Sequence, residues 1–194
     1  MTSTVDAMVH YISPMSKPGW IEVICGCMFS GKTEELIRRL RRAEIAKKNI
    51  QVFKPVIDNR YDESDIMTHT SSRLRAFPII SADKILTMVK TSTEVVGIDE
   101  AQFFGEDLVP TCQQLADSGH RVIVAMLDMD SNANPFGSTP NLMAVAEQVT
   151  KLSAICMRCG ESAHRTRRIA GGAATIEIGG ADKYEARCRR CFNL

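Results

Sequence analysis

The sequence predicts an α/β fold: a mainly parallel sheet with helices on both faces, followed by a small C-terminal lobe. Three observations predict it. Short apolar runs alternate with segments of helical periodicity, as in proteins whose parallel strands are joined by helices. A glycine-rich phosphate-binding loop (P-loop), "GCMFSGKT", directly follows the first apolar run. Two C-x-x-C pairs lie near the C-terminal end and mark the lobe.

Strands are expected where apolar residues run together between turn signals. Those segments are 20–25, 50–55, 74–80, the start of 94–104, 121–130 and 150–156. Helices are expected over residues 32–47, 83–90, 106–118 and 141–149. The first helix has one apolar face, which we expect to pack on the sheet. That face consists of Leu36, Ile37, Leu40 and Ala43. The polar segment 58–73 has no periodicity, so it predicts a long loop.

The composition divides the chain into three parts. The 194 residues suffice for one domain with a small appendage, and the apolar content of 44% is ordinary for a packed core. Residues 151–194 carry nine Lys and Arg against four Asp and Glu, although the net charge of the chain is only +1. We expect a flexible N-terminal extension over residues 1–19, a P-loop α/β nucleotide-binding domain over 20–154 and the lobe over 155–194.

Several protein classes are disfavoured by what the chain lacks. A net charge of +1 argues against a protein that grips nucleic acid over its whole surface. No apolar run approaches the roughly 20 residues needed to cross a bilayer. The N-terminal residues lack the basic start and apolar stretch of a secretory leader. We therefore expect a cytoplasmic protein without a membrane partner.

The glycine-rich loop predicts a site for nucleotide phosphates. Gly26 and Gly31 allow a tight turn, and the helix that follows adds the positive end of its dipole. Lys32 is placed to reach the β- and γ-phosphates, and the Thr33 hydroxyl is placed to ligate Mg²⁺. The residues expected to contact ATP and Mg²⁺ are Gly26, Met28, Phe29, Ser30, Gly31, Lys32, Thr33 and Asp99.

An acid at the tip of a second buried strand completes such a site. Asp99 follows "VVGI" and suits Mg²⁺, and Glu100 comes next. Successive residues at a strand end point in different directions, so one acid can face the metal and the other a second substrate. These residues leave the phosphate acceptor open: water would make an NTPase, and a hydroxyl would make a kinase.

The paired cysteines predict a structural metal site. Cys156, Cys159, Cys188 and Cys191 offer four thiolates, a set suited to tetrahedral Zn²⁺ with no position open for water. A redox-active pair is the alternative. The residues between the pairs include "RTRR" and two Gly-Gly steps, so the lobe suits either a lid over a substrate or a basic ribbon that binds nucleic acid.

Several stretches together resemble the type II thymidine kinases. They are "GCMFSGKTEELIRRLRR", "FKPVIDNRYDESDIMTH", "IDEAQFF", "LDMD" with "PFG", "AEQVTKL", "CMRCGESAHRTRR" and "IGGADKYEARCRRC". They follow the family order and span residues 20–191, nearly the whole chain. The glycine loop is generic, whereas "DEAQFF", "PFG" and the zinc-flanked "GGADKYEARC" are specific to this family.

The resemblance implies ATP-dependent phosphorylation of the 5′-hydroxyl of thymidine. It implies that Glu100 is the general base and that Lys32 and Arg60 stabilise the transferred phosphoryl group. Thymine would lie under a zinc-tethered lasso loop that includes Gly179, Gly180 and Tyr184. Met28, Phe103 and Phe136 would line the base site. The resemblance also implies a homotetramer that thymidine triphosphate inhibits. It implies no nucleic-acid partner.

Some positions depart from the family pattern. Cys27 stands where proline is usual, which is expected to loosen the glycine loop slightly, and Met126 replaces a common glycine. Ser131 and Asn132 replace a usual aromatic-then-polar pair. These changes fall on the thymine side and suggest a kinase with altered base preference as one alternative. A nucleic-acid-stimulated P-loop ATPase with a zinc ribbon is the alternative from a different class.

Overall fold

The computed structural model describes residues 18–56, 65–67, 73–171 and 179–194. Its centre is a six-stranded sheet in the order β5-β2-β6-β7-β1-β8. The strands are β1 (Trp20–Gly26), β2 (Ile50–Pro55), β5 (Phe77–Ile79), β6 (Val95–Ile98), β7 (Arg121–Leu127) and β8 (Gln148–Leu152). Every pairing in this sheet is parallel, so the predicted mainly parallel sheet is confirmed.

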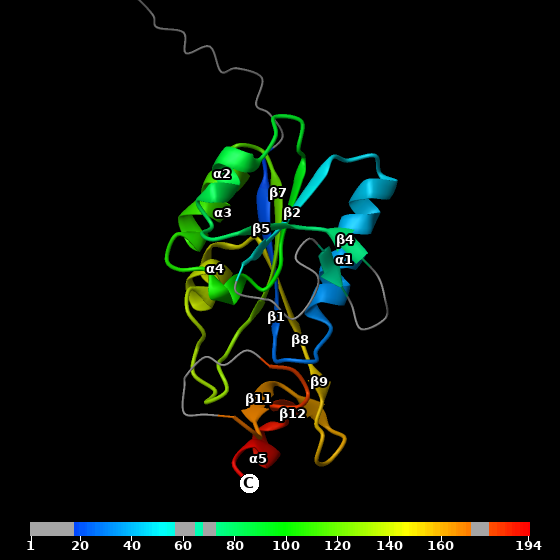
Figure 1. The fold of residues 1–194 in the computed structure, drawn as a ribbon, viewed down its shortest axis with the longest axis vertical. Helices are drawn as coiled ribbons and strands as arrows, with labels where there is room; N and C mark the ends of the chain where they lie inside the picture. Colours follow the sequence, from blue (N-terminus) through cyan, green and yellow to red (C-terminus); the bar gives the residue numbers. More distant parts are fainter. Residues whose placement is uncertain (1–17, 57–64, 68–72, 172–178) are drawn as a thin grey trace, which may run out of the picture.

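Helices cover both faces of the sheet (Figure 1). The helix α1 (Lys32–Ile45) lies on one face, and α2 (Lys84–Met88), α3 (Leu108–Asp117) and α4 (Thr139–Val145) lie on the other. The predicted apolar face of α1 is buried and packs with strand residues such as Ile24 and Val52. The opposite core contains Leu108 and Cys112 of α3 with Val23 of β1. Two apolar cores therefore enclose the sheet.

Two predictions near the edge of the sheet were wrong about where strands begin and end. The segment 74–80 was predicted as one strand, but it forms β4 (Arg73–Arg75) and β5. Pro78 has no N–H to donate to a neighbouring strand. It is tolerated because β5 is the edge strand of this sheet and pairs there only with β2. The predicted loop over 58–73 contains β3 (Asp65–Met67), which pairs with β4 in an antiparallel hairpin.

The segment after β7 also differs from the prediction. The strand expected over 121–130 ends at Leu127, and the helix expected over 141–149 spans 139–145 instead. Pro140 lies in the first turn of α4, where a missing N–H costs nothing. Ala146 has an extended backbone that ends the helix and frees residues 148–152 to form β8.

The C-terminal lobe lies next to the lower ends of β1 and β8 (Figure 1). It contains β9 (Ala154–Ile155), β10 (Ser162–Ala163), β11 (Arg165–Arg168), β12 (Tyr184–Arg187) and the short helix α5 (Arg189–Phe192). These strands form two antiparallel pairs, β9 with β10 and β11 with β12. In the described part of the chain, every helix is too short or too polar to span a bilayer.

Candidate active site and metal centre

The loop between β1 and α1 has the backbone geometry of a phosphate cradle. Gly26, Phe29 and Gly31 all have positive φ, at 146°, 66° and 81°. A Cβ on Gly26 would lie 2.5 Å from the Leu152 carbonyl oxygen, so a side chain there would force the loop away from β8. The helix α1 starts directly after Gly31, and its first-turn N–H groups face the loop.

Polar side chains of the loop converge on one carbonyl group. Lys32 Nζ and Ser30 Oγ each donate a hydrogen bond to the Cys27 carbonyl oxygen, both at 2.8 Å. The lysine ammonium is therefore folded over the loop rather than extended into solvent. This position is consistent with an ammonium that transfers to a bound phosphate, because phosphate oxygens and carbonyl oxygens accept the same donor.

Asp99 lies next to the start of α1, at the end of β6. The Thr33 hydroxyl approaches its two carboxylate oxygens at 3.1 and 3.3 Å. Burial and then the negative charge of Glu100 raise the pKa of Asp99 to about 7, although Thr33 and Lys32 oppose the shift. A hydroxyl beside a buried carboxylate is an oxygen donor set that suits Mg²⁺, and a bound cation would remove the cost of keeping this carboxylate ionised.

Glu100 occupies an unusual backbone conformation directly after Asp99. Its φ is 50°, in the left-handed region that residues other than glycine seldom adopt. Its N–H donates to Asp99 Oδ1 at 3.0 Å, and its Oε2 accepts a hydrogen bond from Gln102 Nε2 at 2.5 Å. Such strain persists only where neighbouring groups hold it, and it is frequent at functional sites.

Two aromatic side chains predicted for the base site lie together. Phe103 ends the short 3₁₀ helix η1 (Ala101–Phe103), and Phe136 lies in the turn before α4. Their ring centroids are 6.3 Å apart with planes at 83°, an edge-to-face contact. The structure thus brings "DEAQFF" and "PFG" to one place, although they are about 30 residues apart in the sequence.

The described part of the predicted lasso forms a tight turn into β12. The N–H groups of Lys183 and Tyr184 both donate to the Gly180 carbonyl oxygen, at 3.1 and 2.9 Å. Tyr184 is buried, and the Arg168 guanidinium lies 5.7 Å from its ring centroid. A Cβ on Gly179 would meet the flexible side chain of Lys183. Arg60 and residues 172–178 lie outside the described residues.

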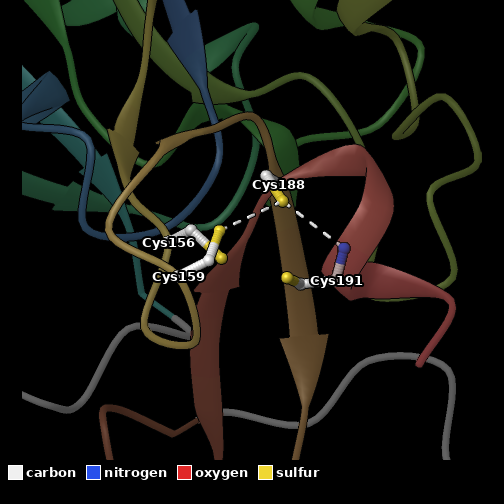
Figure 2. Close-up of side chains that lie close together, drawn as sticks. All are labelled: Cys156, Cys159, Cys188 and Cys191. Atoms are coloured by element: carbon white, nitrogen blue, oxygen red, sulfur yellow. Dashed lines mark hydrogen bonds between the residues drawn. The ribbon is translucent and has the colours of Figure 1, made fainter.

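The four paired cysteines come together in the lobe (Figure 2). One sulfur from each of Cys156, Cys159, Cys188 and Cys191 lies within 4.8 Å of all the others. The sulfurs of Cys159 and Cys188 are 3.7 Å apart. Four sulfurs around a metal at about 2.3 Å would form a tetrahedron with edges of about 3.8 Å. The spacing of these thiols therefore fits Zn²⁺.

Comparisons with known proteins agree with this geometry. A family model described as thymidine kinase matches residues 19–192. The chain belongs to the thymidine kinase family. It is 56% identical over 174 residues to the thymidine kinase of Rhodothermus sp., covering 90% of this chain and 81% of that protein. It is also 56% identical over 174 residues to the thymidine kinase of Bdellovibrio bacteriovorus, covering 90% of this chain and 85% of that protein.

A structural comparison adds little to the family assignment. The X-ray structure of the Legionella pneumophila ATPase DotB matches with a TM-score of 0.46 and 11% identity. The match covers 75% of this chain and 43% of that one.

Two contacts between this thymidine kinase's P-loop and its zinc lobe were not predicted from the sequence. The thiol of Cys27, which is only 1% exposed, donates to the Ala163 carbonyl oxygen at 3.3 Å. The N–H of Met28 donates to Thr166 Oγ1 at 3.0 Å. The one sequence signal at these contacts was the cysteine at position 27, where the family usually has proline. It suggested a looser loop rather than a contact with the lobe.

The other departures from the thymidine kinase pattern lie in different surroundings. Met126 is fully buried and belongs to the core under α3 and α4. Ser131 and Asn132 belong to the turn after β7, where the N–H of Asn132 donates to Asp130 Oδ1 at 2.9 Å. Cys25 and Cys112, which lie outside the paired motifs, are fully buried thiols of the same core.

Proposed function

We propose that this chain transfers the γ-phosphoryl group of ATP to the 5′-hydroxyl of thymidine, giving thymidine monophosphate and ADP. Membership of the thymidine kinase family supports the reaction. The structural observation that carries the proposal is the meeting of the phosphate cradle with the Asp99–Glu100 pair, joined by the hydrogen bond from Thr33 to Asp99. That contact places a carboxylate-bearing strand end beside the loop expected to hold the triphosphate.

On this proposal the P-loop positions the triphosphate. The N–H groups from Phe29 to Thr33 surround its oxygens, and the Lys32 ammonium moves from the Cys27 carbonyl oxygen to the β- and γ-phosphates. Thr33 and Asp99 hold Mg²⁺, which neutralises charge on the phosphates when it is bound. Arg60, which lies outside the described residues, adds a second positive charge on the γ-phosphoryl group.

Glu100 is the general base in this mechanism. Its carboxylate accepts the proton of the 5′-hydroxyl as the hydroxyl oxygen bonds to the γ-phosphorus and the bond from that phosphorus to the bridging oxygen of ADP breaks. A base needs only to lie within hydrogen-bonding distance of the proton that it takes. The left-handed backbone at Glu100 turns its side chain out of the strand direction, which supports a role separate from that of Asp99.

The zinc lobe and the aromatic residues hold the nucleoside on this proposal. Met28, Phe103 and Phe136 contact thymine, and the turn from Gly179 through Gly180 to Tyr184 covers it. A loop that closes over the sugar excludes water, which would otherwise accept the phosphoryl group. Zn²⁺ bound by the four cysteines fixes the lobe and takes no part in the chemistry.

We also propose a cellular form for this enzyme on the basis of the family resemblance. The three parts 1–19, 20–154 and 155–194 are an extension, the nucleotide-binding domain and the lasso domain. The enzyme acts in the cytoplasm as a homotetramer, and thymidine triphosphate inhibits it. Size-exclusion chromatography with light scattering and an inhibition assay test the last two statements.

The decisive experiment is Glu100→Gln with ATP, Mg²⁺ and thymidine. We expect the turnover number, kcat, to fall about 10²- to 10⁴-fold with unchanged ATP binding, because only the proton acceptor is lost. Glu106→Gln is the matched control, because Glu106 is an exposed acid six residues along the chain. Turnover within a few-fold of the unchanged enzyme would remove Glu100 as the base. ATP hydrolysis stimulated by single-stranded DNA, with no thymidine monophosphate formed, would overturn the whole proposal.

A further inference from the structure

Gln102 is a buried amide with both ends hydrogen bonded beside the proposed general base. It is 3% exposed and lies in η1, two residues after Glu100. Its Nε2 donates to Glu100 Oε2 at 2.5 Å, and its Oε1 accepts from the Leu127 N–H at 3.0 Å. A buried amide held at both ends has little freedom to rotate, so it can fix the group that it contacts.

The orientation of this amide follows from its chemistry. A main-chain N–H can only donate, so the Leu127 N–H must face the oxygen of Gln102. The amide nitrogen therefore faces Glu100, whose carboxylate can only accept when it is ionised. A hydrogen bond to a charged acceptor is stronger than one to a neutral acceptor, so the contact can hold the Glu100 carboxylate in one orientation.

The anchor at Leu127 is itself held firmly. Leu127 is the last residue of the central strand β7, and its carbonyl oxygen accepts a hydrogen bond from Thr139 Oγ1 at 2.8 Å. Thr139 is fully buried at the start of α4, and its N–H donates to the Phe136 carbonyl oxygen at 3.0 Å. Gln102 therefore connects the proposed base to the turn that carries the aromatic wall of the base site.

We propose that Gln102 is a positioning residue for phosphoryl transfer: it holds the Glu100 carboxylate in the direction that reaches the 5′-hydroxyl. This inference rests on the proposed role of Glu100 as general base. Gln102 acts through Glu100 and does not contact the P-loop side chains Lys32 and Thr33 in any described hydrogen bond. Its loss therefore lowers kcat and leaves the Michaelis constant, KM, for ATP unchanged.

The test is Gln102→Glu, which has the same shape and keeps an oxygen acceptor for the Leu127 N–H. It replaces the donor that faces Glu100 with a second carboxyl oxygen. We expect kcat to fall about 10- to 100-fold, because a misdirected base loses its alignment with the hydroxyl. The KM for ATP stays within twofold. Gln102→Met, which can neither donate nor accept, gives a loss of similar size if it folds, and direct measurement of ATP binding confirms folding in both variants.

A double variant separates positioning from a general structural effect. If Gln102 acts only through Glu100, adding Gln102→Glu to Glu100→Gln leaves the residual transfer rate within twofold, because effects on one unit are not additive. A full additional loss in the double variant, or a raised KM for ATP in the single variant, would overturn the proposal. So would unchanged kcat in Gln102→Glu while Glu100→Gln is inactive. Activity retained by Glu100→Gln would instead overturn the base assignment itself.

Discussion

The nucleotide-binding domain and the zinc lobe are stabilised in different ways. The two cores of the domain contain large apolar side chains from every covering helix, such as Leu36 and Leu108, and from the sheet, such as Phe53. The buried cluster around the paired cysteines consists of alanines and cysteines: Cys27, Ala154, Cys156, Ala163, Ala186, Cys188 and Cys191. Among the described residues of the lobe, the large buried apolar side chains are Tyr184 and Phe192. Alanine and cysteine bury little apolar surface, so the hydrophobic effect contributes less around the cysteines than in the two cores of the domain. We therefore expect the lobe to depend on the Zn²⁺ proposed for its four cysteines and the domain to fold without it.

The two regions meet at the P-loop rather than through a shared core. Cys27 belongs to the cluster of the lobe although it lies in the loop after β1, and Met28 is hydrogen bonded to Thr166 of β11. A change in the lobe can therefore reach the phosphate site through two residues. Variants in each region, and at the contact between them, test how independent the regions are.

The largest effect is expected from Cys188→Ser, which removes one of the four proposed zinc ligands. Zinc binding in small structural sites is worth about 10–16 kcal/mol, and a quarter of that corresponds to a loss of about 10²- to 10³-fold in affinity. We expect zinc content to fall, the lobe to become sensitive to protease and the KM for thymidine to rise. Metal analysis and limited proteolysis measure this. Cys112→Ala, a buried cysteine of the domain core, is the control that keeps its zinc.

An unchanged zinc content in Cys188→Ser would contradict the ligand assignment. Unfolding of the whole chain, seen as loss of ATP binding, would contradict the separation of the two regions. The expected result lies between these outcomes: the domain stays folded while the lobe is lost.

The next largest effect is expected from Asp99→Asn, which changes the domain and not the lobe. We expect kcat to fall about 10²-fold, because the substitution weakens the proposed ligand of Mg²⁺. The zinc content stays the same. Titration of Mg²⁺ in the kinase assay measures the change, and wild-type dependence on Mg²⁺ in this variant would show that Asp99 does not bind the ion.

The same substitution has an opposite effect on stability. The native pKa of Asp99 is raised from 3.8 to about 7, so between these values the native state binds more protons than the unfolded state. The stability from this group is complete below pH 3.8 and is lost as pH rises through 7. Asparagine carries no charge at either pH, so Asp99→Asn avoids the loss of stability that the ionised Asp99 causes. Without Mg²⁺ we therefore expect the variant to have a free energy of unfolding about 1–3 kcal/mol higher at pH 8. Denaturant unfolding at pH 5 and pH 8 measures it, and an equal effect at both values would contradict the raised pKa.

A smaller effect is expected from the double variant Cys27→Ala and Thr166→Val at the contact between the regions. Each of the two substitutions removes one hydrogen bond, worth about 1 kcal/mol. We expect the KM for ATP to rise about two- to fivefold, and removal of zinc by a zinc-selective chelator, with Mg²⁺ kept in excess, to change that KM less than in the unchanged enzyme. Kinase assays with varied ATP, with and without chelator, measure this. An identical response to the chelator would show that the lobe does not act through these two residues.

The smallest effect is expected from Glu35→Gln on the surface of α1. A hydrogen bond from Arg38, followed by one from Arg39, lowers the pKa of Glu35 to about 2 despite some desolvation. Its stabilisation is present above the unfolded pKa and is lost as pH falls toward 2. Solvent screening limits the pair to about 0.5 kcal/mol, so the variant loses no more than that at pH 7 and nothing at pH 2. A larger loss in thermal unfolding would show that α1 depends on this pair.

Much of the domain could be predicted from the sequence because its signals are local. The apolar face of α1 follows from residue spacing, and the P-loop follows from a short pattern with a strand before it and a helix after it. The two cysteines of each C-x-x-C pair also lie close in sequence. Their spacing indicated the group of four cysteines that the structure brings together.

Other features depend on contacts that the sequence does not show. The hydrogen bond from the Leu127 N–H to Gln102 joins residues 25 positions apart, and its partner is a main-chain group present at almost any position. The contact between Cys27 and Ala163 spans 136 positions. The division of residues 73–79 into β4 and β5 depends on which neighbour each strand pairs with. None of these contacts has a sequence pattern of its own.

The hydrogen bond from Lys32 to the Cys27 carbonyl oxygen has a consequence for nucleotide affinity. An arriving triphosphate does not meet a fully hydrated ammonium, because the lysine has already exchanged part of its water for a protein oxygen. The free energy that Lys32 contributes to binding is therefore the difference between its hydrogen bond to phosphate and its hydrogen bond to the Cys27 carbonyl oxygen. This difference is smaller than the full strength of the contact with phosphate. In return, part of the desolvation of this cation is completed during folding, and less of it remains for the encounter with substrate.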